Sequence, residues 1–183
     1  MSLPAVLEQQ VERWLERFGE SAMRRADLAR VVACSEFAAA TMLREKDWLL
    51  EHVSGFVEPP DAGKLVSAIA DDATVSETKS QLRRFRNRYM LHVLWREIFG
   101  LADIDETLAS LSDLADRALA VAAARAAREL APRFGRVRGA SGREVPLVVL
   151  GMGKLGGREL NFSSDIDLIF LYPEDGVTDG PRQ

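Results

Sequence analysis

The sequence has few cysteines and no long run of apolar residues. Its single cysteine, Cys34, cannot form an intrachain disulfide, and the apolar residues before it predict a buried, reduced thiol. No segment approaches the roughly 18 consecutive apolar residues that a membrane helix needs. The N-terminus lacks the basic residues and apolar core that mark a signal peptide. These absences predict a cytoplasmic protein with no membrane partner.

The sequence also lacks an excess of positive charge. The formal net charge is −4 and the isoelectric point about 5.3, whereas proteins that bind nucleic acids usually carry a basic patch. The run Arg83, Arg84, Arg86 and Arg88 spreads over more than half the circumference of a helix, so it does not form one stripe. We therefore expect no nucleic-acid partner, and we interpret this run as a solvated face or a contact with a partner protein.

What the sequence has over its first 135 positions is helical periodicity. Apolar residues recur there at spacings of three and four, as in Val6, Leu7, Val11, Trp14, Leu15 and Phe18. Gly19 is expected to end this first helix, and Ser35 to cap a later one. With 47% hydrophobic and 28% charged residues, the composition is that of a globular protein. The pattern predicts an all-helical region over residues 1–135.

The remaining helices of this region are bounded by glycine and proline. Residues 54–64 contain Pro59-Pro60 and are expected to form a connector. A long helix is predicted over 76–99, with Ser76 as its cap and Gly100 after its end. The next helix is expected to begin at Asp105, to include the alanine-rich run 115–130, and to stop at Pro132 and Gly135.

The pattern changes after Gly135. Residues 145–150 form a short apolar, β-branched run that predicts a strand buried on both faces, and residues 165–172 predict a second strand. Residues 136–144 are expected to form a hairpin or loop, and the tail 173–183 a loop. The fold class is therefore α+β, with an incomplete sheet over residues 136–183. Because two strands do not make an independently stable sheet, we expect a fragment of a larger protein.

Two nucleotide-binding interpretations compete over the glycines between these strands. Gly151-x-Gly153-x-x-Gly156 matches the dinucleotide fingerprint as a string, but only residues 157–164 separate it from the next strand. A crossover helix to a parallel strand needs about a dozen residues or more. A P-loop is excluded as well, because Lys154 is followed by Leu155 rather than by serine or threonine.

The residues that follow point to metal-dependent chemistry. Asp165 and Asp167 are two residues apart at the predicted strand, so their carboxylates share one face, where they repel each other unless a cation lies between them. Such hard oxygen ligands suit Mg²⁺ or Mn²⁺ bridging to phosphates. A solvated turn is the usual interpretation of Asp-x-Asp, but here a glycine-rich loop precedes it and an apolar strand, expected to be buried, follows. The supplementary phosphate contacts expected are Gly156, Gly157, Lys154, Ser163 and Ser164.

At this point a family resemblance becomes visible. Gly-Gly, a short spacer and Asp-x-Asp resemble the signature of the polymerase-β-like nucleotidyltransferase superfamily. The longer string from Gly151 to Phe170 resembles the N-terminal, adenylyl-removing half of the glutamine synthetase adenylyltransferase family. The stretches 33–37 and 82–88 also resemble that family. The resemblance implies that residues 136–183 begin a nucleotidyltransferase domain.

The resemblance further implies an activity and its partners. The family's N-terminal domain removes AMP from a tyrosine of glutamine synthetase by phosphorolysis and releases ADP, while its C-terminal domain adds AMP from ATP. Both domains use Mg²⁺ and respond to the signalling protein PII. Asp165 and Asp167 would be catalytic metal ligands, with Gly156 and Gly157 as the phosphate-binding turn.

One part of the family's site has no counterpart here. The superfamily has a third carboxylate on a later strand, and the acids of the tail (Glu174, Asp175 and Asp179) are interpreted as solvated turn residues. We therefore expect this chain alone to be inactive. The alternative from another class is a catalytically incomplete helical module that docks on glutamine synthetase.

Overall fold

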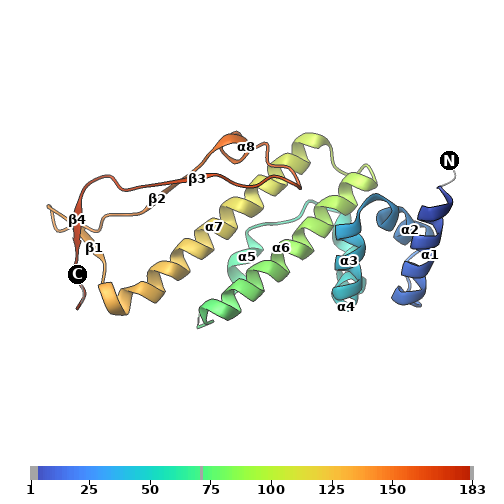
Figure 1. Ribbon diagram of the computed structural model, residues 1–183, viewed down its shortest axis with the longest axis horizontal. Coiled ribbons are helices and arrows are strands. Elements are labelled where there is room, and N and C mark those ends of the chain that lie inside the picture. Colours follow the sequence, from blue (N-terminus) through green and yellow to red (C-terminus); the bar gives the residue numbers. More distant parts are fainter. Residues whose placement is uncertain (1–3, 71, 182–183) are drawn as a thin grey trace. The chain divides into compact units, whose positions relative to one another are not determined.

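The computed structural model describes residues 4–70 and 72–181, whose helices and strands are labelled in Figure 1. These residues divide into two compact units. The first unit combines the described residues up to Asp61 with Arg83–Thr107. The second combines Ala62–Leu82 with the chain from Leu108 onward. Helices and small antiparallel sheets together confirm the α+β class. No helix in the described residues is both long and apolar enough to cross a membrane.

The first unit is helical. Its elements are α1 (Ala5–Phe18), α2 (Arg25–Cys34), α3 (Glu36–Arg44), α4 (Lys46–His52), the 3-10 helix η1 (Val53–Val57) and the later part of α6 (Val75–Ile98). Its core includes Phe18, Met42, Leu49 and Leu91, each almost fully buried. The periodic stripe on α1 is confirmed, because Val11, Trp14, Leu15 and Phe18 are its buried residues.

The helix ends follow local chemistry. Gly19 adopts φ 73°, and its N–H donates to the Leu15 carbonyl, which confirms the expected end of α1. Ser35 caps α3 by accepting from the N–H of Ala38 at 3.2 Å, as expected. Cys34, between these elements, is exposed, so the predicted buried thiol is wrong. Cys34, the last residue of α2, is exposed although the three residues before it are apolar.

Two other helix starts differ from expectation by one or two residues. Thr74, rather than Ser76, caps α6: its hydroxyl accepts from the N–H of Glu77 at 3.3 Å, and Glu77 accepts in return from the Thr74 N–H at 2.8 Å. This reciprocal arrangement is a capping box. Similarly, α7 (Ile104–Phe134) is capped by Asp103, which accepts from the N–H of Glu106 at 2.8 Å.

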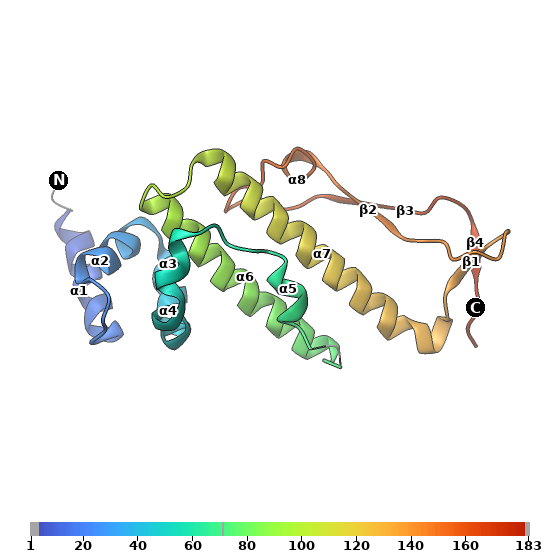
Figure 2. The same ribbon diagram turned by 180° about the vertical axis from the view of Figure 1, so that it is seen from behind.

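The second unit places strands beside helices. It contains α5 (Lys64–Ser67), the start of α6, most of α7, and α8 (Gly153–Gly156). Its strands are β1 (Val137–Gly139), β2 (Val148–Gly151), β3 (Leu168–Leu171) and β4 (Gly176–Thr178). β1 pairs antiparallel with β4, and β2 pairs antiparallel with β3 (Figure 2). In the second pair Val148 lies opposite Leu171.

The end of α7 is partly as expected, because Gly135 follows its last residue but Pro132 does not stop the helix, and the expected loop of the tail is wrong. α7 continues past Pro132 to Phe134, because a proline in the last turn removes only one hydrogen bond near a helix end that Gly135 (φ 70°) then terminates. The tail is not all loop, since β4 pairs with β1 and Asp179 accepts from the N–H of Arg136 at 2.6 Å. Long-range pairing of this kind leaves no local signal.

The expected burial of the two central strands is also wrong. Leu147, Phe170 and Leu171 are exposed, by 59%, 60% and 45% respectively, whereas Val145 is buried. A groove of about 910 Å³ lies between these strands and the alanine-rich face of α7. A two-stranded sheet has no further strand to cover its apolar faces, so side chains typical of a buried strand remain in contact with solvent.

Candidate functional site

The glycine-rich segment forms a compact turn between two antiparallel strands. β2 ends at Gly151, and α8 makes a short helical turn directly after it. The N–H of Met152 donates to the carbonyl of Asp167 at 2.9 Å, which holds the two ends of the connection together. Because β2 and β3 are antiparallel, this is not the parallel βαβ unit of a dinucleotide-binding fold, in agreement with the sequence argument.

The two adjacent glycines of the turn have different roles. A Cβ added at Gly156 would lie 2.5 Å from the carbonyl oxygen of Gly151, whereas one at Gly157 would meet nothing closer than 3.6 Å. The N–H groups of Gly156 and Gly157 donate to the carbonyls of Met152 and Gly153, so they are used within the turn. Gly156 is therefore required for close backbone packing, and Gly157 is not.

We expect Gly156→Ala to displace the turn. A methyl group against a backbone oxygen cannot be accommodated by a side-chain rotation, and overpacking of this kind costs about 1–3 kcal/mol. Backbone amide NMR signals over residues 151–157 should shift in this variant. Gly157→Ala is the matched control, because Gly157 has φ −80° and room for a methyl group. Equal shifts in both variants would contradict this account.

Asp165 and Asp167 lie directly before β3 rather than within it. The strand begins at Leu168, one residue after Asp167. Both aspartates are exposed, and within the described residues neither carboxylate makes a hydrogen bond or an ion pair. Two free carboxylates two positions apart are a donor set that fits a divalent cation such as Mg²⁺. The described residues contain no cluster of three or more His, Cys, Asp or Glu side chains able to hold a metal ion.

The serines before these aspartates are tied to Asn161. Ser164 donates to the Asn161 side-chain oxygen at 2.5 Å, and Ser163 lies 3.5 Å from the same oxygen. The backbone closes the same turn, because the Ser164 N–H donates to the Asn161 carbonyl. Asn161 was absent from the sequence-based site, although Asn followed by Ser-Ser is a recognisable turn signal. The serines thus shape the turn that leads to Asp165.

Lys154 supplies a free positive charge beside the turn. It lies in α8, its side chain is exposed, and within the described residues its ammonium group makes no hydrogen bond or ion pair. An ammonium group in this state is available to a phosphate. The structure thus leaves Lys154 and both candidate metal ligands uncommitted, whereas the N–H groups of the two glycines and the hydroxyls of the two serines are engaged within their turns.

The acids of the tail divide into two kinds. Asp179 holds β1 and β4 together, because it accepts from the Arg136 N–H and from the Arg138 guanidinium at 2.8 Å. The hydrogen bond from the Arg136 N–H, together with that from Arg138, lowers the pKa of Asp179. Asp179 therefore has a structural role, and its interpretation as a solvated turn acid is wrong. Glu174 and Asp175 are exposed, as expected.

Sequence reasoning missed the residues that connect this site to α7. The guanidinium of Arg158 lies 2.6 Å from Asp113 and 3.6 Å from Asp116, both on α7. The hydrogen bond to Asp113 and the charge of that carboxylate raise the pKa of Arg158. No local pattern indicates a contact between residues so far apart in the sequence.

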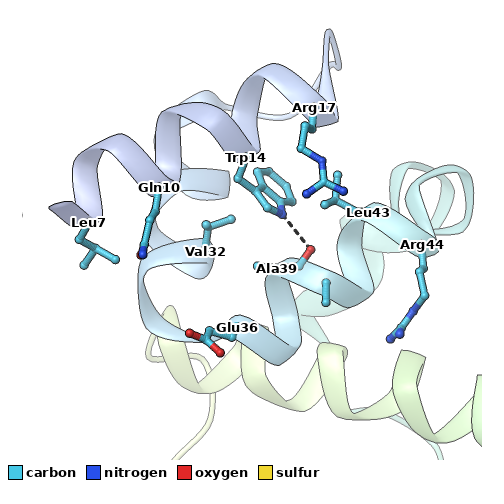
Figure 3. A pocket seen from close by; sticks show the side chains of 10 residues that line it. Leu7, Gln10, Trp14, Arg17, Val32, Glu36, Ala39, Leu43 and Arg44 are labelled. Atoms are coloured by element: carbon cyan, nitrogen blue, oxygen red, sulfur yellow. Dashed lines mark hydrogen bonds between the residues drawn. The ribbon is translucent and has the colours of Figure 1, made fainter.

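A separate groove lies on the first unit, between α1 and α3 (Figure 3). Its volume is about 440 Å³, and Trp14 lies at its centre, donating its ring N–H to the Ala39 carbonyl at 2.9 Å. Arg17 and Arg44 lie at one end and Glu36 at the other (Figure 3). This groove contains none of the residues predicted for the chemistry.

A glycine turn joined to two free carboxylates, with an uncommitted lysine beside it, defines a candidate site for phosphate and a divalent cation. Comparison with known proteins identifies the family. The family model described as glutamate-ammonia ligase adenylyltransferase matches residues 25–183, which include every candidate site residue. The chain therefore belongs to the glutamate-ammonia ligase adenylyltransferase family.

Individual relatives agree with the family match. The chain is 41% identical to a protein of Thioalkalivibrio sulfidiphilus over 98% of this chain and 20% of the relative. It is 40% identical to a Pseudomonas aeruginosa protein over 100% of this chain and 19% of the relative. Both relatives are named bifunctional glutamine synthetase adenylyltransferase/adenylyl-removing enzyme. The chain thus spans about a fifth of the length of these relatives.

Proposed function

We propose that this chain is part of a protein that regulates glutamine synthetase by adenylyl transfer, and that it contributes to the adenylyl-removing site. The observation that carries the proposal is the family match across the glycine turn and both free aspartates. Residues 1–135 would form a helical region, and residues 136–183 the start of a nucleotidyltransferase domain. Glutamine synthetase would be the protein substrate, and PII a regulatory partner.

In the proposed reaction, an oxygen of inorganic phosphate attacks the phosphorus of tyrosine-bound AMP. The new phosphorus–oxygen bond yields ADP, and the bond to the tyrosine oxygen breaks, so that the hydroxyl is restored with a proton. Asp165 and Asp167 would hold Mg²⁺, which would supply positive charge to neutralise the reacting phosphates. Lys154 would bind a phosphate oxygen, while Gly156 and the serines of the Asn161 turn keep the carboxylates close to it.

A hybrid enzyme tests this proposal. In it, this chain replaces the segment of the Pseudomonas aeruginosa relative that it matches. With adenylylated glutamine synthetase as substrate, the hybrid enzyme should release ADP only when inorganic phosphate and Mg²⁺ are both present. No ADP release, under conditions in which the intact relative releases it, would overturn the proposal.

A binding measurement added to this assay separates the alternative of a docking module. The docking alternative is favoured by the groove between α1 and α3, a surface separate from the glycine turn. It predicts that the 183-residue chain binds glutamine synthetase, and that the hybrid enzyme also binds it but does not release ADP. Absence of binding in both would remove it.

A further inference from the structure

We propose that Arg158 is a positioning residue that fastens the segment between the glycine turn and Asp165 to helix α7. The inference rests on the proposed function, since it concerns the same site. It assigns a role to three residues, Arg158, Asp113 and Asp116, that the sequence pattern did not single out. All three belong to the second unit.

The first observation is the backbone of Arg158. Its φ is 58°, and among the described residues it is the one non-glycine residue with positive φ. This conformation is unfavourable for a residue with a Cβ, and it persists only where the surrounding structure enforces it. Glycine would adopt it freely, and glycine occupies the neighbouring position 157. The contacts of the side chain are therefore what distinguishes arginine from glycine at this position.

The second observation is what this side chain contacts. One guanidinium nitrogen of Arg158 lies 2.6 Å from an Asp113 oxygen, and another lies 3.6 Å from an Asp116 oxygen. Residues three apart on a helix share a face, so α7 presents both carboxylates in the same direction. A planar guanidinium can engage the two at once, which fixes its orientation more narrowly than a single ion pair would.

A second contact with α7 is made by Leu160, two residues after Arg158. Leu160 is buried, and its N–H donates to the hydroxyl of Ser112 at 3.3 Å. Ser112 is fully buried and donates its own hydrogen to the Leu108 carbonyl at 2.8 Å. Ser112 directly precedes Asp113, so adjacent residues of α7 hold Arg158 and Leu160. Residues 158–160 are thus attached to α7 by the exposed ion pairs of Arg158 and by the buried hydrogen bond of Leu160.

The position of the carboxylates follows from these attachments. Leu160 is followed by the hydrogen-bonded Asn161 turn, which leads to Asp165. The other end of the connection is fixed by the bond between Met152 and Asp167. These attachments hold the backbone on both sides of Asp165 and Asp167. Placement of this kind supports catalysis by avoiding reorganisation before the reaction.

Arg158→Gly tests the role of the side chain while keeping the backbone conformation favourable. In the 183-residue chain, amide hydrogen exchange over residues 159–167 should become about two- to five-fold faster, as expected for the loss of a partly exposed ion pair. Exchange in α1–α4 should not change. The charge-reversed variant Arg158→Glu with Asp113→Lys and Asp116→Lys should restore slow exchange, because it rebuilds the attraction with opposite signs.

The hybrid enzyme supplies the functional measurement. Arg158→Gly should lower kcat for ADP release about two- to ten-fold with KM for adenylylated glutamine synthetase unchanged, and charge reversal should recover most of the loss. Unchanged exchange in Arg158→Gly overturns the proposal, as does faster exchange with an unaltered kcat. If the hybrid enzyme with Arg158 intact releases no ADP, the proposed function fails instead, and hydrogen exchange still decides whether Arg158 fastens the segment.

Discussion

Asp165→Asn in the hybrid enzyme is expected to lower kcat for ADP release by about 10³-fold or more. The substitution keeps the shape of the side chain but removes one of the two free negative charges before β3. A bound metal ion contributes several kcal/mol to transition-state stabilisation in such reactions, and each factor of ten corresponds to about 1.4 kcal/mol. The measurement is the rate of ADP formation at saturating phosphate and Mg²⁺.

Asp175→Asn is the matched control for this substitution. Asp175 is an exposed aspartate in the loop between β3 and β4, so the same chemical change there should leave the rate unaltered. Thermal unfolding of both variants checks that neither has lost its fold. ADP release by Asp165→Asn at a rate within a few-fold of the unaltered hybrid enzyme would remove Asp165 from the site.

The parts of the fold that sequence reasoning predicted are those governed by neighbouring residues. Gly19 ends α1 because only a residue tolerant of positive φ continues the chain there, and Ser35 caps α3 through its own hydroxyl. The connection from Gly151 to Asp167 was also predictable as something other than a βαβ unit, because it is too short to cross over to a parallel strand. The structure pairs its strands antiparallel.

The parts that could not be predicted depend on residues far apart in the sequence. β4 exists because residues 176–178 pair with β1, about 40 positions earlier in the sequence, and nothing in the tail itself indicates a strand. The same holds for Arg158, whose partners on α7 precede it by more than 40 positions. At the candidate site, residue types predicted which side chains are chemically suitable. They did not predict which of them are already engaged in the fold.

The burial of a strand is a further property that its composition alone does not predict. The apolar run at 145–150 has the composition of a strand covered on both faces, yet Leu147 and Leu150 are exposed. The composition of a strand determines how much apolar surface it has, whereas its burial depends on how many other strands and helices pack against that surface. In the described residues β2 has one partner strand, β3, so part of this surface remains accessible.

Arg96→Met is expected to lower the free energy of unfolding of the first unit by about 3 kcal/mol, because it removes the buried guanidinium of an ion pair whose carboxylate, on Glu106, is partly exposed. Arg96 is only 4% exposed. Its guanidinium donates to both carboxylate oxygens of Glu106, at 2.7 and 3.1 Å. It also donates to the carbonyls of Phe56, Val57 and Leu101. Methionine fills similar space but leaves the carboxylate and these carbonyls without a donor.

Urea unfolding followed by tryptophan fluorescence measures this loss, because all three tryptophans, Trp14, Trp48 and Trp95, lie in the first unit. Arg86→Met is the matched control on the same helix. Arg86 is exposed, so its substitution should change the free energy of unfolding by less than about 0.5 kcal/mol. Similar values for the two variants would mean that the contacts of Arg96 do not hold η1 and the start of α7 against α6. A large difference would show that the hydrogen bonds and the ion pair of Arg96 contribute substantially to the stability of the first unit.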